Sequence, residues 1–316
     1  MTPMTETIDF LGIGAQKAAT SWLWENLRQH PDIWLPPKKE LHYFDRSPAY
    51  PSPGYLASDR LFTRVFGKNK GDRKFRKIFP RDMKAAYKKK DWEETRWMLR
   101  YYLGTYNDDW YRSLFKNGAG KLKGEITPSY ALLNEADVQR ISESFPSLKI
   151  IFLLRNPIDR AWAQVRYNWT RGKFKNIHDH DKVKSFIESR SQSLRSDYIR
   201  TLDIWGARFP EEQIFIGFFD DVVRSSQSLI HNILEFLEVE NTRFTDKKTL
   251  DKKVKVSKPL EFPEEIKSYL SMKYLPELQA LSERVGSHAT RWLEEAEELL
   301  QSGQDTIAGK SKAKGT

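Results

Sequence analysis

The chain has 316 residues, a net charge of +10 and a composition that is 39% hydrophobic and 13% aromatic, which suits a globular core and excludes a disordered protein. It contains no cysteine, so disulfides and cysteine-rich zinc sites are excluded, and no apolar run approaches the roughly 20 residues that span a bilayer. The polar, acid-containing segment 1–9 argues against a signal peptide, and we expect a soluble, cytoplasmic protein.

The first predicted elements are a strand and a helix joined by a short polar loop. Ile8–Ile13 is an apolar run that predicts a buried strand, and Trp22–His30 predicts a helix with one buried face. Between them lie small residues, Lys17 and the hydroxyls of Thr20 and Ser21. Loop amides and the positive end of the helix dipole converge at such a junction. We therefore expect this loop to bind a phosphate or a chemical relative of phosphate.

The segment 36–45 contains the best candidate for a general base. Glu40 and His42 are two residues apart, so on an extended segment their side chains face the same side. An unperturbed Glu has a pKa of about 4.3. Partial burial beside Tyr43 and Phe44 is expected to raise the pKa of Glu40 toward that of a better base. The alternative is a surface cluster of charges with a histidine at the edge of the core.

Residues from about 50 to 104 form a predicted insertion rich in charge and aromatic side chains. Segment 68–90 alone has eleven Lys/Arg and two Asp. Either it is a surface for an anionic partner, such as a polysaccharide, an acidic lipid headgroup or a nucleic acid, or it is a solvated insertion. The aromatic side chains of Trp92, Trp97, Tyr101 and Tyr102 suit stacking on sugars, although such clusters also form cores.

The rest of the chain repeats the order strand then helix. Strands are predicted at 149–154 and 213–219, with helices at 158–171 and 225–237, then two terminal helices within 263–300 and a disordered tail at 301–316. This alternation predicts an α/β fold, with one domain over 1–300 and a central parallel sheet covered on both faces. Functional groups are then expected at the carboxyl ends of the strands. Arg155 follows the strand at 149–154 and can bind a phosphate with its planar fork, or pair with Asp159.

Two motifs resemble those of the sulfotransferases, which use 3′-phosphoadenosine 5′-phosphosulfate (PAPS). The string Q-K-A-A-T-S at 16–21 is similar to their 5′-phosphosulfate loop, Q-K-x-G-T-[TS], with Ala19 in place of glycine. That change matters only if the backbone needs a positive φ there. The string R-N-P-I-D-R-A-W that begins at Arg155 resembles the 3′-phosphate motif R-x-P-x-x-R-A-x-S, with Ala163 at the serine position. Either Gln164 or Tyr167 replaces that hydroxyl, or the nucleotide binds more weakly.

Two further strings resemble the heparan-type carbohydrate sulfotransferases. The segment K-E-L-H at 39–42 looks like their K-E-x-H-F-F, in which the glutamate takes the proton of the acceptor hydroxyl. The string G-E-I-T-P-S-Y at 124–130 is similar to G-E-K-[ST]-P-x-Y, with Ile126 replacing the lysine, so Ile126 is not placed in the site. Glu125 is either a support at the end of a strand or an alternative base. Segment 252–258 resembles a late basic loop that closes over the nucleotide, or is a solvated turn.

The resemblance implies a three-layer, P-loop-like α/β fold and transfer of a sulfuryl group from PAPS, without a metal, to a hydroxyl or less favourably an amine. The acceptor it implies is a carbohydrate or glycolipid, with no nucleic acid partner. Glu40 is then the base, Lys17 stabilises the leaving phosphate, and His42 acts directly or orients the site. The implied nucleotide-binding residues are Gln16, Lys17, Ala18, Ala19, Thr20, Ser21 and Arg155.

Two alternatives remain open from the sequence. A P-loop kinase or other NTPase needs lysine directly before a hydroxyl residue and a bound magnesium ion, whereas Lys17 lies three residues before Thr20. A non-catalytic binder of anionic polymers would use the basic insertion and would be indifferent to substitution of Lys17.

Overall fold

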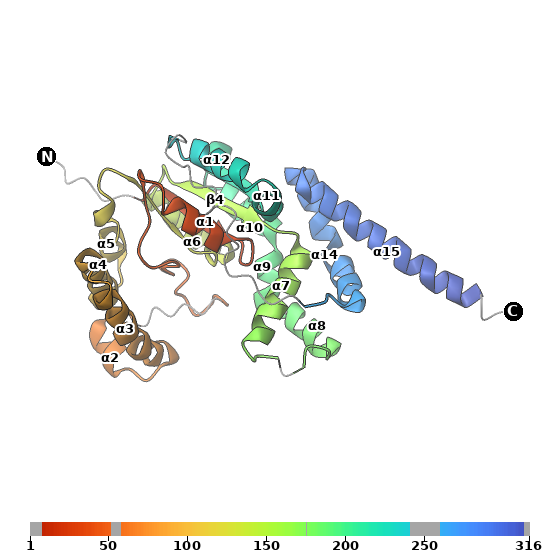
Figure 1. Ribbon diagram of the computed structural model, residues 1–316, viewed down its shortest axis with the longest axis horizontal. Helices are drawn as coiled ribbons and strands as arrows, with labels where there is room; N and C mark the ends of the chain where they lie inside the picture. The colour runs from red at the N-terminus through yellow and green to blue at the C-terminus, as the bar shows by residue number, and fades with distance from the viewer. Residues whose placement is uncertain (1–7, 52–57, 175, 241–259, 313–316) are drawn as a thin grey trace.

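A five-stranded parallel sheet forms the centre of the protein in the computed structural model, which describes residues 8–51, 58–174, 176–240 and 260–312 (Figure 1). The strand order is β2-β3-β1-β4-β5. The strands are β1 (Phe10–Gly14), β2 (Ile33–Trp34), β3 (Leu122–Ile126), β4 (Lys149–Leu154) and β5 (Ile214–Phe218). The predicted α/β fold is thereby confirmed.

The two central strands are buried on both faces. Every residue of β1 and all of β4 except Lys149 are buried. Since successive side chains of a strand point to opposite faces, helices must cover both faces of the sheet, as the near-continuous apolar runs predict. Phe10 pairs with Gly124 on β3, where a Cβ atom would lie 2.4 Å from the Phe10 ring. Glycine therefore lets the Phe10 ring lie flat against β3.

Helices α1 (Thr20–Leu27) and α7 (Pro157–Thr170) follow β1 and β4. Helix α1 begins two residues before the predicted start and ends three before the predicted end, whereas α7 matches its prediction to within one residue. Pro157 at the first turn of α7 has no N–H to leave unpaired, and the Asn156 side chain accepts a hydrogen bond from the Ile158 amide. The remaining helices around the sheet are α5 (Asp108–Ser113), α6 (Glu135–Ser144), α8 (His180–Glu188), α9 (Arg190–Ser196), α10 (Tyr198–Gly206), α11 (Phe219–Arg224) and α12 (Ser226–Phe236).

The predicted insertion is a small helical unit. It consists of α2 (Leu61–Phe66), α3 (Lys70–Lys88) and α4 (Trp92–Leu103), which lie together at one side of the molecule (Figure 1). Trp97, Tyr101 and Tyr102 are buried, so these three aromatic side chains belong to the core and do not form a platform for sugars. Trp92, by contrast, is 62% exposed.

Two long helices, α14 (Glu264–Val285) and α15 (His288–Lys312), end the described chain and pack against each other. The backbone of 301–312 continues α15, where the sequence predicted a disordered tail. Extension of an existing helix avoids the cost of nucleation, which explains why polar, glycine-containing residues continue it. The basic segment 252–258 lies outside the described residues. Within the described residues, every helix is too short or too polar to cross a bilayer.

Candidate functional site

The loop between β1 and α1 adopts a left-handed backbone at two positions. Lys17 has φ 74° and Ala19 has φ 63°. The methyl group of a non-glycine residue costs roughly 1–2 kcal/mol in this conformation. The glycine of the resembling motif therefore matches a real conformational need, and Ala19 introduces strain that the sequence alone does not reveal. The loop leads directly into α1, whose first residue, Thr20, is buried.

Arg155 lies against this loop because β1 and β4 are neighbours in the sheet. Its Nη1 donates a hydrogen bond of 3.1 Å to the carbonyl oxygen of Lys17. Its guanidinium carbon lies 4.2 Å from the centre of the Phe219 ring, and its Nε is buried without a hydrogen-bond partner among the described residues. Burial lowers the pKa of Arg155, and the charge of Asp159 opposes that effect. The structure thus brings the two sequence motifs together at the carboxyl edge of the sheet.

Two more arginines lie near these loops: Arg160, within the second motif, and Arg195 on α9. Arg160 is fully buried, and its Nε donates to Ser196 Oγ at 2.6 Å. Both of its Nη atoms are without a hydrogen-bond partner among the described residues. Arg195 on α9 donates through Nε to the side-chain oxygen of Gln16. The amide nitrogen of Gln16 in turn donates to Ser129 Oγ at 3.0 Å. Sequence reasoning did not assign Arg195, because no motif surrounds it and it is far from Gln16 in the chain.

The basic side chains at this edge of the sheet repel one another electrostatically. Burial, followed by the charges of Arg171, Arg155, Arg160 and Arg166, lowers the pKa of Lys17 to about 8. Burial and the charge of Arg160 lower the pKa of Arg195 to about 10. Buried cations are costly unless a counter-charge is near. The cluster is therefore suited to a ligand that carries several negative charges.

Gln164 and Tyr167 are the two neighbours that the sequence offers as a replacement for the hydroxyl missing at Ala163, and of these Tyr167 lies next to Lys17. The Nζ of Lys17 lies 3.4 Å from the centre of the Tyr167 ring. Gln164 instead donates to Asn168 on its own helix, at 3.4 Å. Ala163 is buried. Tyr167 is thus the neighbour that contacts the predicted site, and it contacts Lys17.

The side chains of Glu40 and His42 lie next to each other, as predicted, but the segment that carries them is not extended. Their φ angles are 65° and 56°, so the backbone turns at both residues. The His42 Nε2 lies 3.6 Å from Glu40 Oε2, and its Nδ1 lies 2.8 Å from Asp45 Oδ2. Lys39 Nζ donates to Glu40 Oε1 at 2.7 Å and lies 3.4 Å from Oγ1 of Thr20, the first residue of α1. Lys39 therefore links the candidate base to the candidate anion site.

The predicted rise in the pKa of Glu40 is wrong. Burial does act to raise the pKa, but the hydrogen bonds and charges of His42 and Lys39 outweigh it and lower the pKa to about 2. For His42, burial acts to lower the pKa, and the carboxylates of Asp45 and Glu40 raise it to about 9. At neutral pH, Glu40 is therefore an anion that can accept a proton, and His42 is a cation that cannot.

Glu125 is a buried support rather than an exposed base. It is 2% exposed, and burial raises the pKa of its carboxyl group. The carboxylate accepts four hydrogen bonds, from Tyr111 Oη, Tyr130 Oη, Thr127 Oγ1 and the amide of Leu41. The last of these holds the backbone between Glu40 and His42. Ile126 on the same strand is buried at 1% exposure, in keeping with its exclusion from the site.

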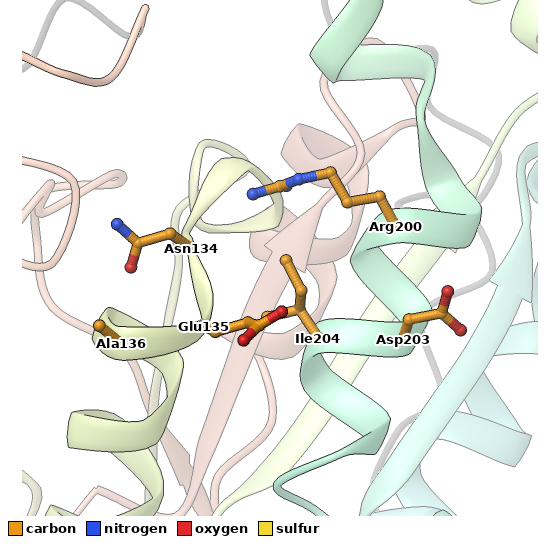
Figure 2. A pocket seen from close by; sticks show the side chains of 6 residues that line it. All are labelled: Asn134, Glu135, Ala136, Arg200, Asp203 and Ile204. Atoms are coloured by element: carbon orange, nitrogen blue, oxygen red, sulfur yellow. The ribbon is translucent and has the colours of Figure 1, made fainter.

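A separate hollow of about 580 Å³ lies between the start of α6 and α10 and contains none of the predicted site residues. Figure 2 shows Arg200 reaching from α10 toward the loop of Asn134, and its Nη2 donates to the carbonyl oxygen of Leu133 at 3.0 Å. In the described part of the chain, no group of three or more His, Asp or Glu side chains is placed to hold a metal ion.

Comparisons with known proteins agree with the motifs and the fold. A sequence model described as the sulfotransferase family matches residues 10–244. A sulfotransferase from Alicyclobacillus acidocaldarius has a similar fold, with a TM-score of 0.62 and 20% identity over 90% of this chain and 98% of that chain. The sulfotransferase domain of the Synechococcus PCC 7002 olefin synthase has a TM-score of 0.47 and 17% identity over 87% and 97% of the respective chains.

No curated protein matches the sequence significantly. The family match covers well over half of the chain, and the similar solved structure confirms the three-layer, P-loop-like fold. The chain therefore belongs to the sulfotransferase family, whose members are enzymes that transfer a sulfuryl group.

Proposed function

We propose that the sulfuryl donor is PAPS. The observation that carries this proposal is the cluster of cations, half-buried except for the fully buried Arg160, around the loops that follow β1 and β4. Lys17 and the loop amides suit the 5′-phosphosulfate, and Arg155 suits the 3′-phosphate. Arg160, with two Nη atoms that lack a partner among the described residues, adds a donor to the same region. A nucleotide that carries anionic groups at its 3′ and 5′ positions needs two cationic binding points of this kind.

The proposed reaction is an in-line displacement at sulfur. The acceptor oxygen forms a bond to the sulfur as the bond from sulfur to the bridging oxygen of the 5′-phosphate breaks. Glu40 takes the proton of the acceptor hydroxyl, and Lys17 stabilises the charge that develops on the departing phosphate. His42 orients Glu40 through its cationic ring. The remaining nucleotide contacts are proposed for Gln16, Ala18, Ala19, Thr20 and Ser21.

The low pKa of Glu40 suggests a role for Lys39 in this reaction. A carboxylate with a pKa near 2 is a weak base. Lys39 lies between Glu40 and Thr20, so a donor anion in the loop competes with Glu40 for its charge. Once Lys39 turns toward the donor, the pKa of Glu40 rises, because one of the groups that lower it has moved. We propose that donor binding activates the base in this way.

The proposed acceptor is a hydroxyl of a carbohydrate or glycolipid, with an amine as the less favoured group. Support comes from the K-E-x-H segment at 39–42, where Glu40 and His42 lie within 3.6 Å of each other. We propose no metal, since the transferred sulfuryl group carries less charge than a terminal phosphoryl group. The order of residues in the β1–α1 loop disfavours a P-loop kinase.

Calorimetric titration of 3′-phosphoadenosine 5′-phosphate (PAP), 5′-AMP and ATP with magnesium tests the donor. We expect PAP to bind at least about tenfold more tightly than either, since only PAP engages both anchors. Arg155→Ala should remove that preference for PAP over 5′-AMP, whereas Lys121→Ala, at an exposed lysine, should retain it. A preference for ATP would overturn the assignment. Transfer from labelled PAPS to a panel of carbohydrates, glycolipids and amines then identifies the acceptor.

A further inference from the structure

Helix α3 carries a continuous stripe of positive charge along one face. Positions spaced by three or four residues lie on the same face of a helix, and six exposed basic residues follow this spacing. They are Lys70, Arg73, Lys77, Arg81, Lys84 and Lys88. The opposite face is apolar and packs on α4, where Phe75 and Phe79 contact Tyr102 with ring centres 6.0 and 5.3 Å apart. The helix is therefore amphipathic, with its basic stripe directed away from the protein.

The acidic residues of α3 do little to neutralise this stripe. Asp72 is buried and accepts hydrogen bonds from Ser58. Asp82 contacts Arg81 at one oxygen, and its other oxygen accepts from Lys38 at 2.8 Å. Arg81 is the one stripe residue in an ion pair among those found in the described residues. Most of the charge is therefore available to an external anion.

Exposed aromatic pairs stand in the chain just before α3 and at its end. Phe62 and Phe66 on α2 are 75% and 67% exposed, with ring centres 4.8 Å apart. Tyr87 and Trp92, at the corner between α3 and α4, are 64% and 62% exposed, with ring centres 5.9 Å apart. Four large aromatic side chains at the surface of one small unit are unusual for a protein face that meets only water.

We propose that this basic aromatic surface, formed by the α3 stripe and the two aromatic pairs, docks on an anionic lipid bilayer. Lysines and arginines attract acidic headgroups, and each basic residue near such a surface contributes about 1 kcal/mol, or roughly fivefold in binding. Tyr and Trp favour the headgroup region, and Phe inserts at its inner boundary. A soluble acidic polymer without rings, such as an acidic polypeptide, would use the cations but would gain little from exposed Phe62 and Phe66. The aromatic pairs therefore favour the membrane.

The position of the unit is compatible with docking. Helices α2, α3 and α4 lie on the side of the molecule opposite α14 and α15, with α2 at the outer end (Figure 1). No segment of the described chain covers Phe62 or Phe66, as their exposure shows. The surface is also joined to the candidate site, because Lys38, which bonds Asp82 and Tyr102 in the unit, lies two residues before Glu40. Docking goes beyond sulfuryl transfer and does not depend on it.

Co-sedimentation with lipid vesicles tests the proposal on the full chain, without donor or acceptor. Vesicles of phosphatidylcholine with phosphatidylglycerol should bind the protein, and vesicles of phosphatidylcholine alone should not. Lys77→Glu with Lys84→Glu should weaken binding by about tenfold or more. Phe62→Ser with Phe66→Ser should also weaken it by about tenfold or more, since two apolar side chains no longer leave water.

Matched control variants alter equally exposed residues elsewhere. Arg208→Glu with Arg224→Glu, and Val223→Ser with Met272→Ser, should bind the vesicles as the unaltered protein does. Absence of binding to the anionic vesicles, or equal binding by the Phe62/Phe66 variant, would overturn the proposal. Retention on soluble polyglutamate that is unaffected by the Phe62/Phe66 variant, with no vesicle binding, would also overturn it and indicate an acidic polymer. PAP binding, measured on the same variants, should be unchanged, so this test is independent of the proposed donor.

Discussion

The affinity for the donor should decrease as the pH rises from 7 to 9, because Lys17 loses its proton in this range. The pKa of Lys17 is lowered to about 8 by burial and by the neighbouring arginines, against an ordinary value of 10.5. A bound anion restores the pKa of Lys17 toward its ordinary value. A protein molecule whose Lys17 is neutral must therefore take up a proton when it binds PAP. At pH 7 about nine-tenths of Lys17 is protonated, and at pH 9 about one-tenth. The dissociation constant for PAP should thus increase by about tenfold, or about 1.4 kcal/mol, between these pH values.

Calorimetry in two buffers of different ionisation enthalpy measures both the affinity and the proton uptake. We expect an uptake by Lys17 of about half a proton per PAP at pH 8. Lys17→Arg is the control, because a guanidinium keeps its charge over the whole range and should flatten the profile. His42, whose pKa is raised to about 9, is unchanged in that control and so reports any contribution of its own. A constant affinity from pH 7 to 9, or an equal slope in Lys17→Arg, would refute the assignment of the pH dependence to Lys17.

Three further predictions concern single residues. Glu40→Gln should lower the rate of sulfuryl transfer by about 100-fold or more, because the amide cannot accept the proton; PAP affinity should be retained or increase, because the amide no longer competes for Lys39, and a normal rate would remove Glu40 from the chemistry. Ala19→Gly should raise the thermal unfolding midpoint by about 1–2 °C. The reason is that the strain relieved at the left-handed residue exceeds the entropic cost of a more flexible unfolded chain, and a lower midpoint would contradict this. Glu125→Leu should lower the free energy of unfolding by at least about 2 kcal/mol in urea titrations, because four donors lose their acceptor, whereas the exposed Glu135→Leu should change it by less than about 0.5 kcal/mol.

The sequence was sufficient to predict three of the five strands, β1, β4 and β5, and the meeting of the two main motifs, whereas the short β2 and the charge-containing β3 were not predicted. Lys17 and Arg155 each follow an apolar strand, and parallel strands bring their carboxyl ends to one edge, so both residues were expected at that edge. The structure adds that β1 and β4 are neighbours. The lowered pKa of Glu40 could not be predicted from the sequence, because it depends on where the side chains of Lys39 and His42 lie relative to Glu40. A local pattern gives the residue types, but not the distances that decide which electrostatic effect dominates.

Other features of the site depend on contacts between distant parts of the chain. Arg195 reaches Gln16 only because α9 packs near the β1–α1 loop, and its sequence surroundings carry no signal of that contact. The left-handed φ of Ala19 follows from the tight connection between β1 and α1. Alanine, unlike glycine, does not indicate a positive φ in a sequence. The aromatic residues of the insertion were ambiguous in sequence, because burial of Tyr101 and exposure of Trp92 depend on how α3 and α4 pack.

Two adjacent lysines give the loop before Glu40 two different attachments. Lys38 bonds Asp82 and Tyr102 in the helical unit, and Lys39 bonds Glu40 and Thr20. The loop before Glu40 is therefore attached to α3 and α4 through one lysine, and to the candidate site through the next. Thermodynamic linkage makes such an attachment reciprocal: whatever factor a membrane contributes to donor affinity, the donor must contribute to membrane affinity.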